Sequence, residues 1–455
     1  MKRPRLPATN LLPGMGKELI STADWSRRAA TLVSAVLIGL VAIGFAIAGD
    51  HASQLFERTT HRSPWVYLVS APLVFVAIAA FTNRFAKDAR GSGIPQVIAA
   101  SRTPGNAAIA GLVAIRTALF KAVLTVAALL GGASVGREGP TVQLGAAIMV
   151  QVHRLFRVPL TAGVYIAGGA AGVAAAFNTP LAGIAFAIEE LAVAYEQRVA
   201  VLVMGAVMIS GLTAQGISGD YVYFGHISGS LPIGTVLIAA PIAGLAGGAA
   251  GGLFSRMVLA LRGPGGRFAA RLSARPLTTA LVCGVVVGAL GYVTAGATSG
   301  TGYEPTRALL SGADAEYWFG PAKFVSALAT SASGIPGGIF APSLAVGAGF
   351  GELLTPLFPP EQAGLIILIG MGGYFTGVVR APLTAVIILS EATGSSHAIL
   401  PLFATALIGD WAGSLVCKER LYHALAGDFA PSVKPDESDG MGDEDPPKGS
   451  TAGNA

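Results

Sequence analysis

The stretch GGASVGREGP, residues 131–140, places an arginine and a glutamate side by side between glycines and ends in a proline. The chain is uncharged before it back to Lys121 and after it out to His153. Glycines permit unusual backbone angles and a proline suits the first helical turn, so the stretch predicts a helix that begins here. Such a helix start presents unpaired N–H groups and the positive end of the helix dipole, which together suit a small anion.

Two further stretches have the same design, GSGIP at residues 91–95 and GIFAP at residues 338–342. An anion bound by amide groups dissociates more easily than one bound by a lysine or arginine. A protein that conducts anions requires such reversible binding. Glycines can also serve only for close packing between membrane helices, and for one motif alone that alternative stays open. The residues of the three motifs that we take as a predicted anion filter are Gly91, Gly93, Ile94, Pro95, Gly136, Arg137, Gly139, Pro140, Gly338, Ala341 and Pro342.

The composition indicates a polytopic membrane protein. Apolar residues make up 53% of the 455-residue chain and charged residues 12%, with a mean hydropathy of +0.63, whereas soluble domains carry about 25% charged residues. Uncharged runs long enough to cross a lipid bilayer cover residues 29–49, 63–83, 158–188, 199–219, 276–303 and 324–351. The 61 glycines and 27 prolines interrupt these runs, which predicts helices that stop part-way through the membrane.

The two ends of the chain differ from its middle. Residues 1–28 are basic and precede a long apolar run, which favours a cytoplasmic N-terminus and argues against a cleaved signal. The net charge of +5 therefore bears on topology and does not imply a nucleic-acid partner. Residues 427–455 form an acidic tail that we expect to be disordered. Cys283 and Cys417 lack metal-ligand spacing, so we expect no metal site.

The two halves of the chain repeat each other at an offset of 202 residues. At this offset GREGP aligns with GIFAP, and TPLAGIAFAIEE (179–190) aligns with APLTAVIILSEA (381–392). We therefore expect one membrane repeat over residues 29–219 and a second over 220–426. Paired repeats with broken helices predict a binding site between the halves, although this pattern alone leaves inverted and parallel repeats open.

The sequence resembles the CLC family of chloride channels and proton-coupled chloride transporters. GSGIP, GREGP and GGIFAP are the filter signatures of that family in its order, and AAAFNTPLAGIAFAIEE (174–190) and LYHALAG (421–427) also match. The resemblance implies an all-α fold of two inverted-topology repeats of tilted and broken helices. It also implies a homodimer, whose interface we expect within residues 180–219 and 397–415.

The same resemblance assigns an anion site. Ser92 matches the serine that donates to chloride, Tyr422 matches the tyrosine that closes the site from the cytoplasm, and Ile339 and Phe340 match the donors of backbone N–H groups. Hydroxyl and amide donors bind chloride without a charge that would trap it. Taken singly, Ser92 also fits a helix cap and Tyr422 an interfacial aromatic.

Two glutamates carry the predicted proton chemistry. Glu138 matches the external gate of the family, whose carboxylate competes with chloride at a helix start; a structural pair with Arg137 is the alternative. Glu190 matches the internal proton-transfer glutamate, and an ordinary helix-end acid is its alternative. Arg137 and Glu189 are expected to be structural, and Glu189 has a repeat partner in Glu391.

Other positions add details. Lys121 matches a lysine below the filter and either raises the local positive potential or pairs with an unidentified carboxylate. Gln96 and Ile98 stand where the best-known bacterial exchangers have acids, which leaves the intracellular proton route open.

These features predict a Cl⁻/H⁺ antiporter in a bacterial inner membrane, with both termini cytoplasmic and no cofactor or catalytic activity. A passive chloride channel is the alternative within the family. An intramembrane serine protease would need Gly-x-Ser-x-Gly together with a histidine within a membrane span, but most of the six histidines lie near likely segment ends or loops. No ATP-binding P-loop occurs, and a purely structural scaffold would not need the two glutamates.

Overall fold

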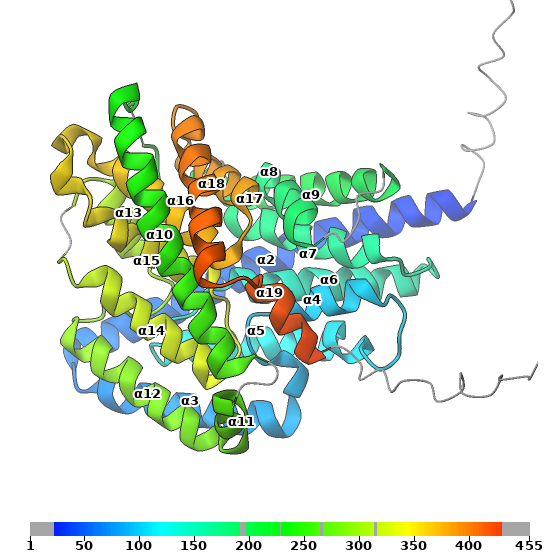
Figure 1. Ribbon diagram of the computed structural model, residues 1–455. Helices are drawn as coiled ribbons and strands as arrows, with labels where there is room; N and C mark the ends of the chain where they lie inside the picture. Colours follow the sequence, from blue (N-terminus) through cyan, green and yellow to red (C-terminus); the bar gives the residue numbers. More distant parts are fainter. Residues whose placement is uncertain are drawn as a thin grey trace, which may run out of the picture.

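A computed structural model describes residues 22–191, 197–219, 221–227, 229–263, 267–313 and 316–429. Within these ranges the chain is helical and contains no strand (Figure 1). Most of the predicted basic segment and acidic tail, residues 1–21 and 430–455, lies outside the described residues. The first half contains α2 (Thr22–Arg62), α3 (Val66–Phe85), α4 (Ile94–Arg102), α5 (Ile115–Leu130), α6 (Glu138–Leu155), α7 (Ala162–Phe177), α8 (Pro180–Phe186), a π-helical turn η3 (Ala187–Leu191) and α9 (Gln197–Ser218).

The second half follows the same plan. It contains α10 (Ile233–Arg262), α11 (Arg267–Ala274), α12 (Pro276–Val293), α13 (Tyr303–Leu310), α14 (Phe319–Ser333), α15 (Phe340–Glu352), α16 (Ala363–Val379), α17 (Pro382–Thr393), α18 (Ile399–Val416), α19 (Leu421–Ala426) and a final turn η6 (Gly427–Phe429). Short 3₁₀ turns, η1 (Lys87–Ala89), η2 (Ala110–Val113), η4 (Thr355–Leu357) and η5 (Pro360–Gln362), connect some of these helices.

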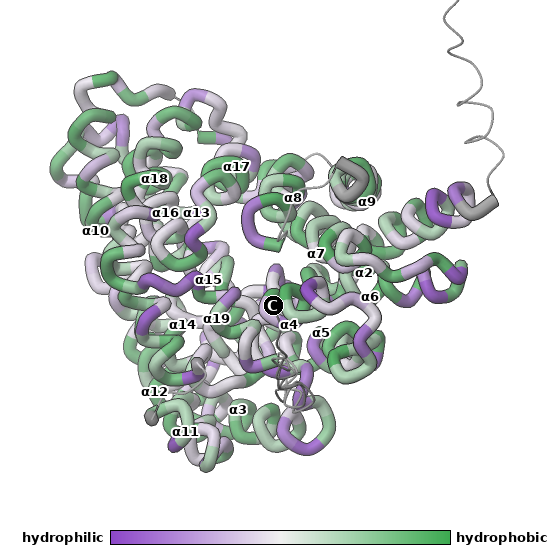
Figure 2. The backbone as a smooth tube through the Cα atoms, turned by 45° about the vertical axis from the view of Figure 1, so that its right-hand side comes forward, coloured by the Kyte–Doolittle hydropathy of each residue, from purple (hydrophilic) through white to green (hydrophobic). Residues whose placement is uncertain are grey.

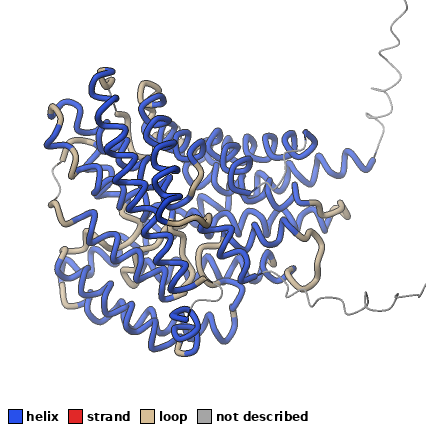
Figure 3. Tube along the Cα trace, in the orientation of Figure 1, coloured by secondary structure: helices blue, strands red, loops and turns tan. Residues whose placement is uncertain are grey.

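Seven helices of the described chain are long and apolar enough to cross a membrane. The prediction of broken helices is confirmed for two of the apolar runs. Residues 158–188 divide into α7 and the short α8, and residues 324–351 divide into α14 and α15 around the GIFAP motif. Residues 276–303 instead contain α12, one of the seven long helices, followed by a loop before α13. The broken ends lie where loops meet inside the helical body (Figure 3).

The packing of the helices repeats between the halves. In the first half α2 packs on α7 and α9, and α6 packs on α5 and α7. In the second half α10 packs on α16 and α18, and α15 packs on α14 and α16. The contacts between the halves include α3 with α12 at one end and α8 with α17 at the other (Figure 1).

A backbone bridge shows how the two repeats are related. Gly136 and Gly338, which the offset of 202 residues aligns, form an isolated antiparallel bridge. Each N–H donates to the other carbonyl oxygen at 2.7 Å. Two equivalent residues that exchange both bonds in antiparallel fashion lie across a local two-fold axis. The repeats are therefore inverted, which resolves the alternative that the alignment left open.

The outer surface of the helical body is apolar. Hydrophobic segments cover the long helices in Figure 2, and large side chains such as Leu73, Leu400 and Leu415 are exposed. A soluble protein rarely exposes so much apolar surface, whereas lipid accepts it. The described helices thus form an all-α membrane protein, as predicted.

Candidate anion site and its glutamates

The three glycine-proline motifs each lead into a buried helix start. Gly93, with φ 109°, is the N-terminal cap of α4 and reaches a conformation that side-chain-bearing residues rarely adopt. Arg137 and Ile339 occupy the same position before α6 and α15, and none of the three starts has a side-chain cap. Their first N–H groups are therefore left for another acceptor.

Close packing of backbone holds these starts together. A side chain at Gly338 would lie 3.0 Å from the carbonyl oxygen of Gly136 and 3.0 Å from the nitrogen of Gly139. A side chain at Gly139 would meet the hydroxyl and carbonyl of Ser92. The glycines thus serve the close packing considered above and also bring the three motifs to one point.

Lys121 and Lys323 are equivalent in the repeat and have equivalent contacts. The buried amine of Lys121 donates to the carbonyl oxygens of Arg90 and Gly91 at 3.3 and 2.7 Å. Lys323 donates to those of Thr298, Ser299 and Gly300 at 2.9–3.2 Å. Of the two alternatives for Lys121, a carboxylate partner is not found among the described residues, and the amine instead fixes the loop before α4.

Glu138 is the first residue of α6 and is 1% exposed. Its carboxylate lies beside the N–H groups of Glu138 itself and of Ala341, at the starts of α6 and α15. Neither oxygen makes a hydrogen bond of good geometry with a described residue. The carboxylate thus occupies the position that the two helix starts offer to an anion.

The hydroxyls of Ser92 and Tyr422 come together below this point. Both are buried and close to each other, yet neither makes a hydrogen bond of good geometry with any described group. Buried polar groups are nearly always hydrogen-bonded, and each exception calls for an explanation. The structure thus brings these two predicted site residues together. Two neighbouring hydroxyl donors without a partner suit a small anion.

Aromatic rings enclose the site on one side. The rings of Phe340 and Tyr422 are stacked at 5.9 Å, and Phe340 also contacts Phe186 and Phe375 at 5.7 and 5.0 Å. Phe186 is the last residue of α8, directly before the π-helical turn that carries Glu190. This packing excludes water from one side of the site, and electrostatic contacts are stronger where water is excluded.

Arg137 forms its ion pair with Asp50 rather than with Glu138. Its guanidinium donates to Asp50 Oδ1 at 2.5 Å and to the carbonyl oxygen of Ala46 at 2.8 Å, both on α2. The expectation that this arginine needs a carboxylate partner fits this contact. Asp50 was missed in the sequence because its only signal is that it ends the first apolar run, 87 residues before Arg137.

Glu189 and Glu391 each accept hydrogen bonds from the first N–H groups of a helix in the other repeat. The carboxylate of Glu189 accepts from the N–H groups of Leu383 and Thr384 at 3.1 and 2.7 Å, in the first turn of α17. That of Glu391 accepts from the N–H groups of Leu181 and Ala182 at 3.2 and 2.8 Å, in the first turn of α8.

Glu190 has a different environment. Its side chain is fully buried and its two oxygens have no hydrogen-bond partner among the described residues. The ring of His423 lies beside it, with Nε2 3.7 Å from Oε1. Arg102 donates to Nδ1 of this ring at 2.8 Å, so Nε2 carries the hydrogen and donates to the carbonyl oxygen of Glu190. Burial, Arg102 and Arg420 lower the pKa of His423, so its ring is neutral at pH 7.

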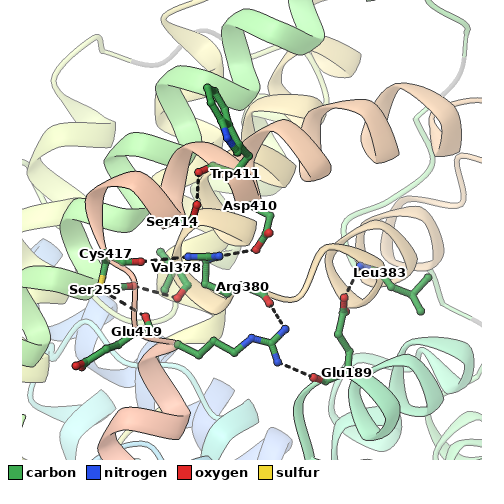
Figure 4. A network of polar contacts seen from close by, with 11 residues as sticks. Glu189, Ser255, Val378, Arg380, Leu383, Asp410, Trp411, Ser414, Cys417 and Glu419 are labelled. Carbon is green, nitrogen blue, oxygen red and sulfur yellow. Dashed lines mark hydrogen bonds and ion pairs between the residues drawn. The ribbon is translucent and has the colours of Figure 1, made fainter.

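A polar network around Arg380, Asp410 and Glu189 (Figure 4) holds the start of α19, the helix that carries Tyr422. Arg420 donates to the carbonyl oxygens of Glu189 and Arg380 at 3.2 and 2.9 Å. Arg380, which ends α16 in the left-handed backbone conformation, forms an ion pair with Asp410 at 2.6 Å. The short helix is therefore tied to both repeats.

Together these features define an inverted-repeat membrane protein with an amide- and hydroxyl-lined site occupied by one carboxylate. The family model described as Voltage gated chloride channel matches residues 73–414. The chain belongs to this family. It is 32% identical over 412 residues to the H(+)/Cl(-) exchange transporter ClcA of Vibrio cholerae, with 83% of this chain and 84% of that one covered. It is 31% identical over 408 residues to the protein of that name from Cronobacter sakazakii, covering 82% and 84%.

Solved structures share the fold. A slow cyanobacterial Cl-/H+ antiporter superposes with a TM-score of 0.76 at 24% identity, covering 88% of this chain and 97% of that one. A CLC-type fluoride/proton antiporter gives a TM-score of 0.74 at 23% identity, covering 89% and 99%. These relatives are transporters, and the similarity of the structures extends over nearly all the described helices.

Proposed function

We propose that the protein exchanges chloride for protons across a bacterial inner membrane. The observation that carries this proposal is the carboxylate of Glu138 at the two helix starts, with the unused hydroxyls of Ser92 and Tyr422 below it. The names of the ClcA relatives, H(+)/Cl(-) exchange transporters, support it. Chloride is the substrate, and no cofactor takes part.

Chloride binds between the hydroxyls of Ser92 and Tyr422 and the N–H groups of Ile339 and Phe340. Among the described residues, neither of these two N–H groups donates to a backbone carbonyl. All four groups are neutral donors, which bind an anion reversibly.

Glu138 acts as the gate. When ionised, its carboxylate excludes chloride from the outer helix starts. When it gains a proton, it loses its attraction to the N–H groups of residues 138 and 341, and chloride replaces it. Protonation of this one residue thereby decides whether chloride can occupy the outer helix starts, which couples the two fluxes.

Glu190 supplies the proton from the cytoplasmic side. Tyr422 lies within electrostatic reach of both Glu190 and Glu138, so the two carboxyl groups flank the anion site. The rings of Phe186 and Phe340 pack on each other, and Phe340 stacks on Tyr422. The proton is proposed to pass beside the chloride site rather than along the chloride path.

The protein is proposed to act as a homodimer with both termini in the cytoplasm. Helix α8 has seven residues, too few to cross a bilayer, and its Leu181 and the following Ile188 are 57% and 43% exposed. A broken helix is tolerated at membrane depth only where protein or water covers its ends. A second copy packed on α8, α9 and α18, within the interface expected from the sequence, provides that cover.

Reconstitution into liposomes tests the exchange. Vesicles loaded with chloride and diluted into low-chloride buffer are expected to take up protons as chloride leaves, with an alkaline shift of the external pH. Chloride efflux without proton movement would refute the exchanger and leave the passive channel. Vesicles without protein are the control for leak.

A further inference from the structure

A cavity of about 540 Å³ opens between the filter and the end of α19. Ser92 and Ile339 line it together with Arg90, Arg262, Asp428 and Phe429. It therefore joins residues of the proposed anion site to three charged side chains that the exchange mechanism does not use.

Arg262, in the last turn of α10, has no polar partner in the part of the chain that the structure describes. It makes no hydrogen bond and no ion pair with any described residue, although its side chain is partly buried. Its guanidinium lies against the backbone of Gly334, where a side chain at that glycine would stand. Gly334 ends α14, four residues before the GIFAP motif. An arginine left unpaired at such a place is available to an anion that enters the cavity.

Arg90 supplies a second cation. It directly precedes the GSGIP motif, and its guanidinium carbon lies 5.8 Å from the centre of the Phe429 ring. Contact with the face of an aromatic ring orients a guanidinium without neutralising it. Arg90 and Arg262 are close enough to repel each other electrostatically, so an anion between them would relieve that repulsion.

Asp428 supplies the opposing charge. It lies in the turn η6, six residues after Tyr422, and interacts electrostatically with both Arg90 and Arg262. It forms no ion pair within 4 Å with a described residue, and its side chain is open to water. Its carboxylate thus stays near the two arginines without being held by either.

We propose that Arg90 and Arg262 form an anion-capture site at the cytoplasmic mouth of the pore, and that the carboxylate of Asp428 is its built-in competitor. The ligand class is small monovalent anions, above all chloride on its way to or from Ser92. Two positive charges in a walled cavity raise the local anion concentration, and one tethered carboxylate keeps the binding weak enough for release. This inference rests on the proposed anion route past Ser92.

Thiol accessibility measures the charge of the cavity without transport. Ser273 lines the cavity, so Ser273→Cys is made in a chain whose Cys283 and Cys417 are alanines. The purified protein in detergent is treated with an anionic or a cationic methanethiosulfonate, and the ratio of the two rates reports the local potential. Asp428→Asn is expected to raise the anionic-to-cationic ratio about fivefold, and Arg262→Gln to lower it by a similar factor.

Two control variants are matched in charge. Glu419→Gln removes an exposed acid two residues beyond Cys417, and Arg271→Gln removes an exposed arginine of α11 that does not line the cavity. Both are expected to leave the ratio unchanged. If Asp428→Asn changes the ratio no more than Glu419→Gln, the competitor is refuted; if Arg262→Gln changes it no more than Arg271→Gln, the capture site is refuted.

Chloride efflux from liposomes gives the functional result. Asp428→Asn is expected to lower, and the pair Arg90→Gln and Arg262→Gln to raise, the chloride concentration for half-maximal flux by several-fold, with the proton-to-chloride ratio unchanged. The effect of Asp428→Asn should vanish when both arginines are replaced, and its persistence would overturn the proposal. If the protein moved no protons, the proposed exchange would fail while the thiol measurement would still decide the capture site.

Discussion

Glu189 and Glu391, 202 residues apart, each accept hydrogen bonds from the first turn of the helix that leads to the other. Glu391 lies on α17 and holds the start of α8, while Glu189 follows α8 and holds the start of α17. The two contacts are related by the same two-fold symmetry that pairs Gly136 with Gly338. They fix the junction of the repeats at the end opposite to α3 and α12.

Replacing Glu391 with alanine is expected to weaken this junction. The change leaves the N–H groups of Leu181 and Ala182 without their acceptor and should cost about 1–3 kcal/mol of stability. Thermal unfolding in detergent should show the loss as a lower midpoint, while the remaining folded protein still couples chloride to protons. Glu361→Ala, at an exposed acid between α15 and α16, is the control. An unchanged midpoint for Glu391→Ala would contradict the capping role.

This junction also shows which parts of the fold could be predicted from the sequence. The alignment of Glu189 with Glu391 and of Pro180 with Pro382 can be recognised in the sequence, because single acidic residues and prolines stand out among apolar residues. The alignment does not say how the two repeats are oriented in the membrane, so it could not distinguish inverted from parallel repeats. The direction comes from the antiparallel bridge between Gly136 and Gly338, a contact between distant segments.

The candidate site was partly readable for the same reason. Glycine, proline and lone glutamates are conspicuous in membrane segments, so Ser92, Glu138 and Glu190 could be located. The partners of Arg137 and Lys121 could not, because Asp50 and the carbonyls of residues 90 and 91 carry no local signal. The charged cluster of Arg90, Arg262 and Asp428 joins three distant segments, and only the folded chain places them on one cavity.

Gly338→Ala is expected to abolish chloride flux. The added methyl group would lie 3.0 Å from the backbone of Gly136 and Gly139, neither of which can move without displacing a helix start. The comparison is Gly44→Ala on α2, where an added methyl group meets nothing within 4 Å. Chloride efflux from liposomes should fall to the leak level for the first variant and stay normal for the second. Normal flux in Gly338→Ala would show that the close packing of the motifs is dispensable.

The proposed dimer predicts that a polar group on α8 separates the copies. Leu181→Gln places an amide on the face that we assign to the partner, and its unpaired hydrogen-bonding groups should favour monomers. Leu73→Gln on α3, where Leu73 is 66% exposed, is the control on a face assigned to lipid. Light scattering of the detergent-solubilised protein should give half the protein mass for the first variant only. A dimer that withstands Leu181→Gln as well as Leu73→Gln would move the interface elsewhere.

Glu138→Gln should uncouple chloride from pH. The amide has the shape of the protonated gate and cannot ionise, so it no longer competes with chloride as an anion. In the unmodified protein, chloride flux should rise as the external pH falls, because a proton on Glu138 opens the gate. In the variant, flux should stay fast at every pH and carry no protons. Proton uptake that persisted in Glu138→Gln would exclude this residue as the gate.

Glu190→Val should remove proton movement and spare chloride. The valine cannot carry a proton, and it fits the apolar surroundings of a fully buried side chain. The proposed chloride ligands Ser92 and Tyr422 remain, so chloride efflux from liposomes should continue without a change of external pH. The neighbouring Glu189→Gln separates a proton-transfer role from a structural one, because its carboxylate binds α17. That variant should be less stable yet still couple the two ions, and a Glu190→Val protein that still pumped protons would place the internal proton donor at another residue.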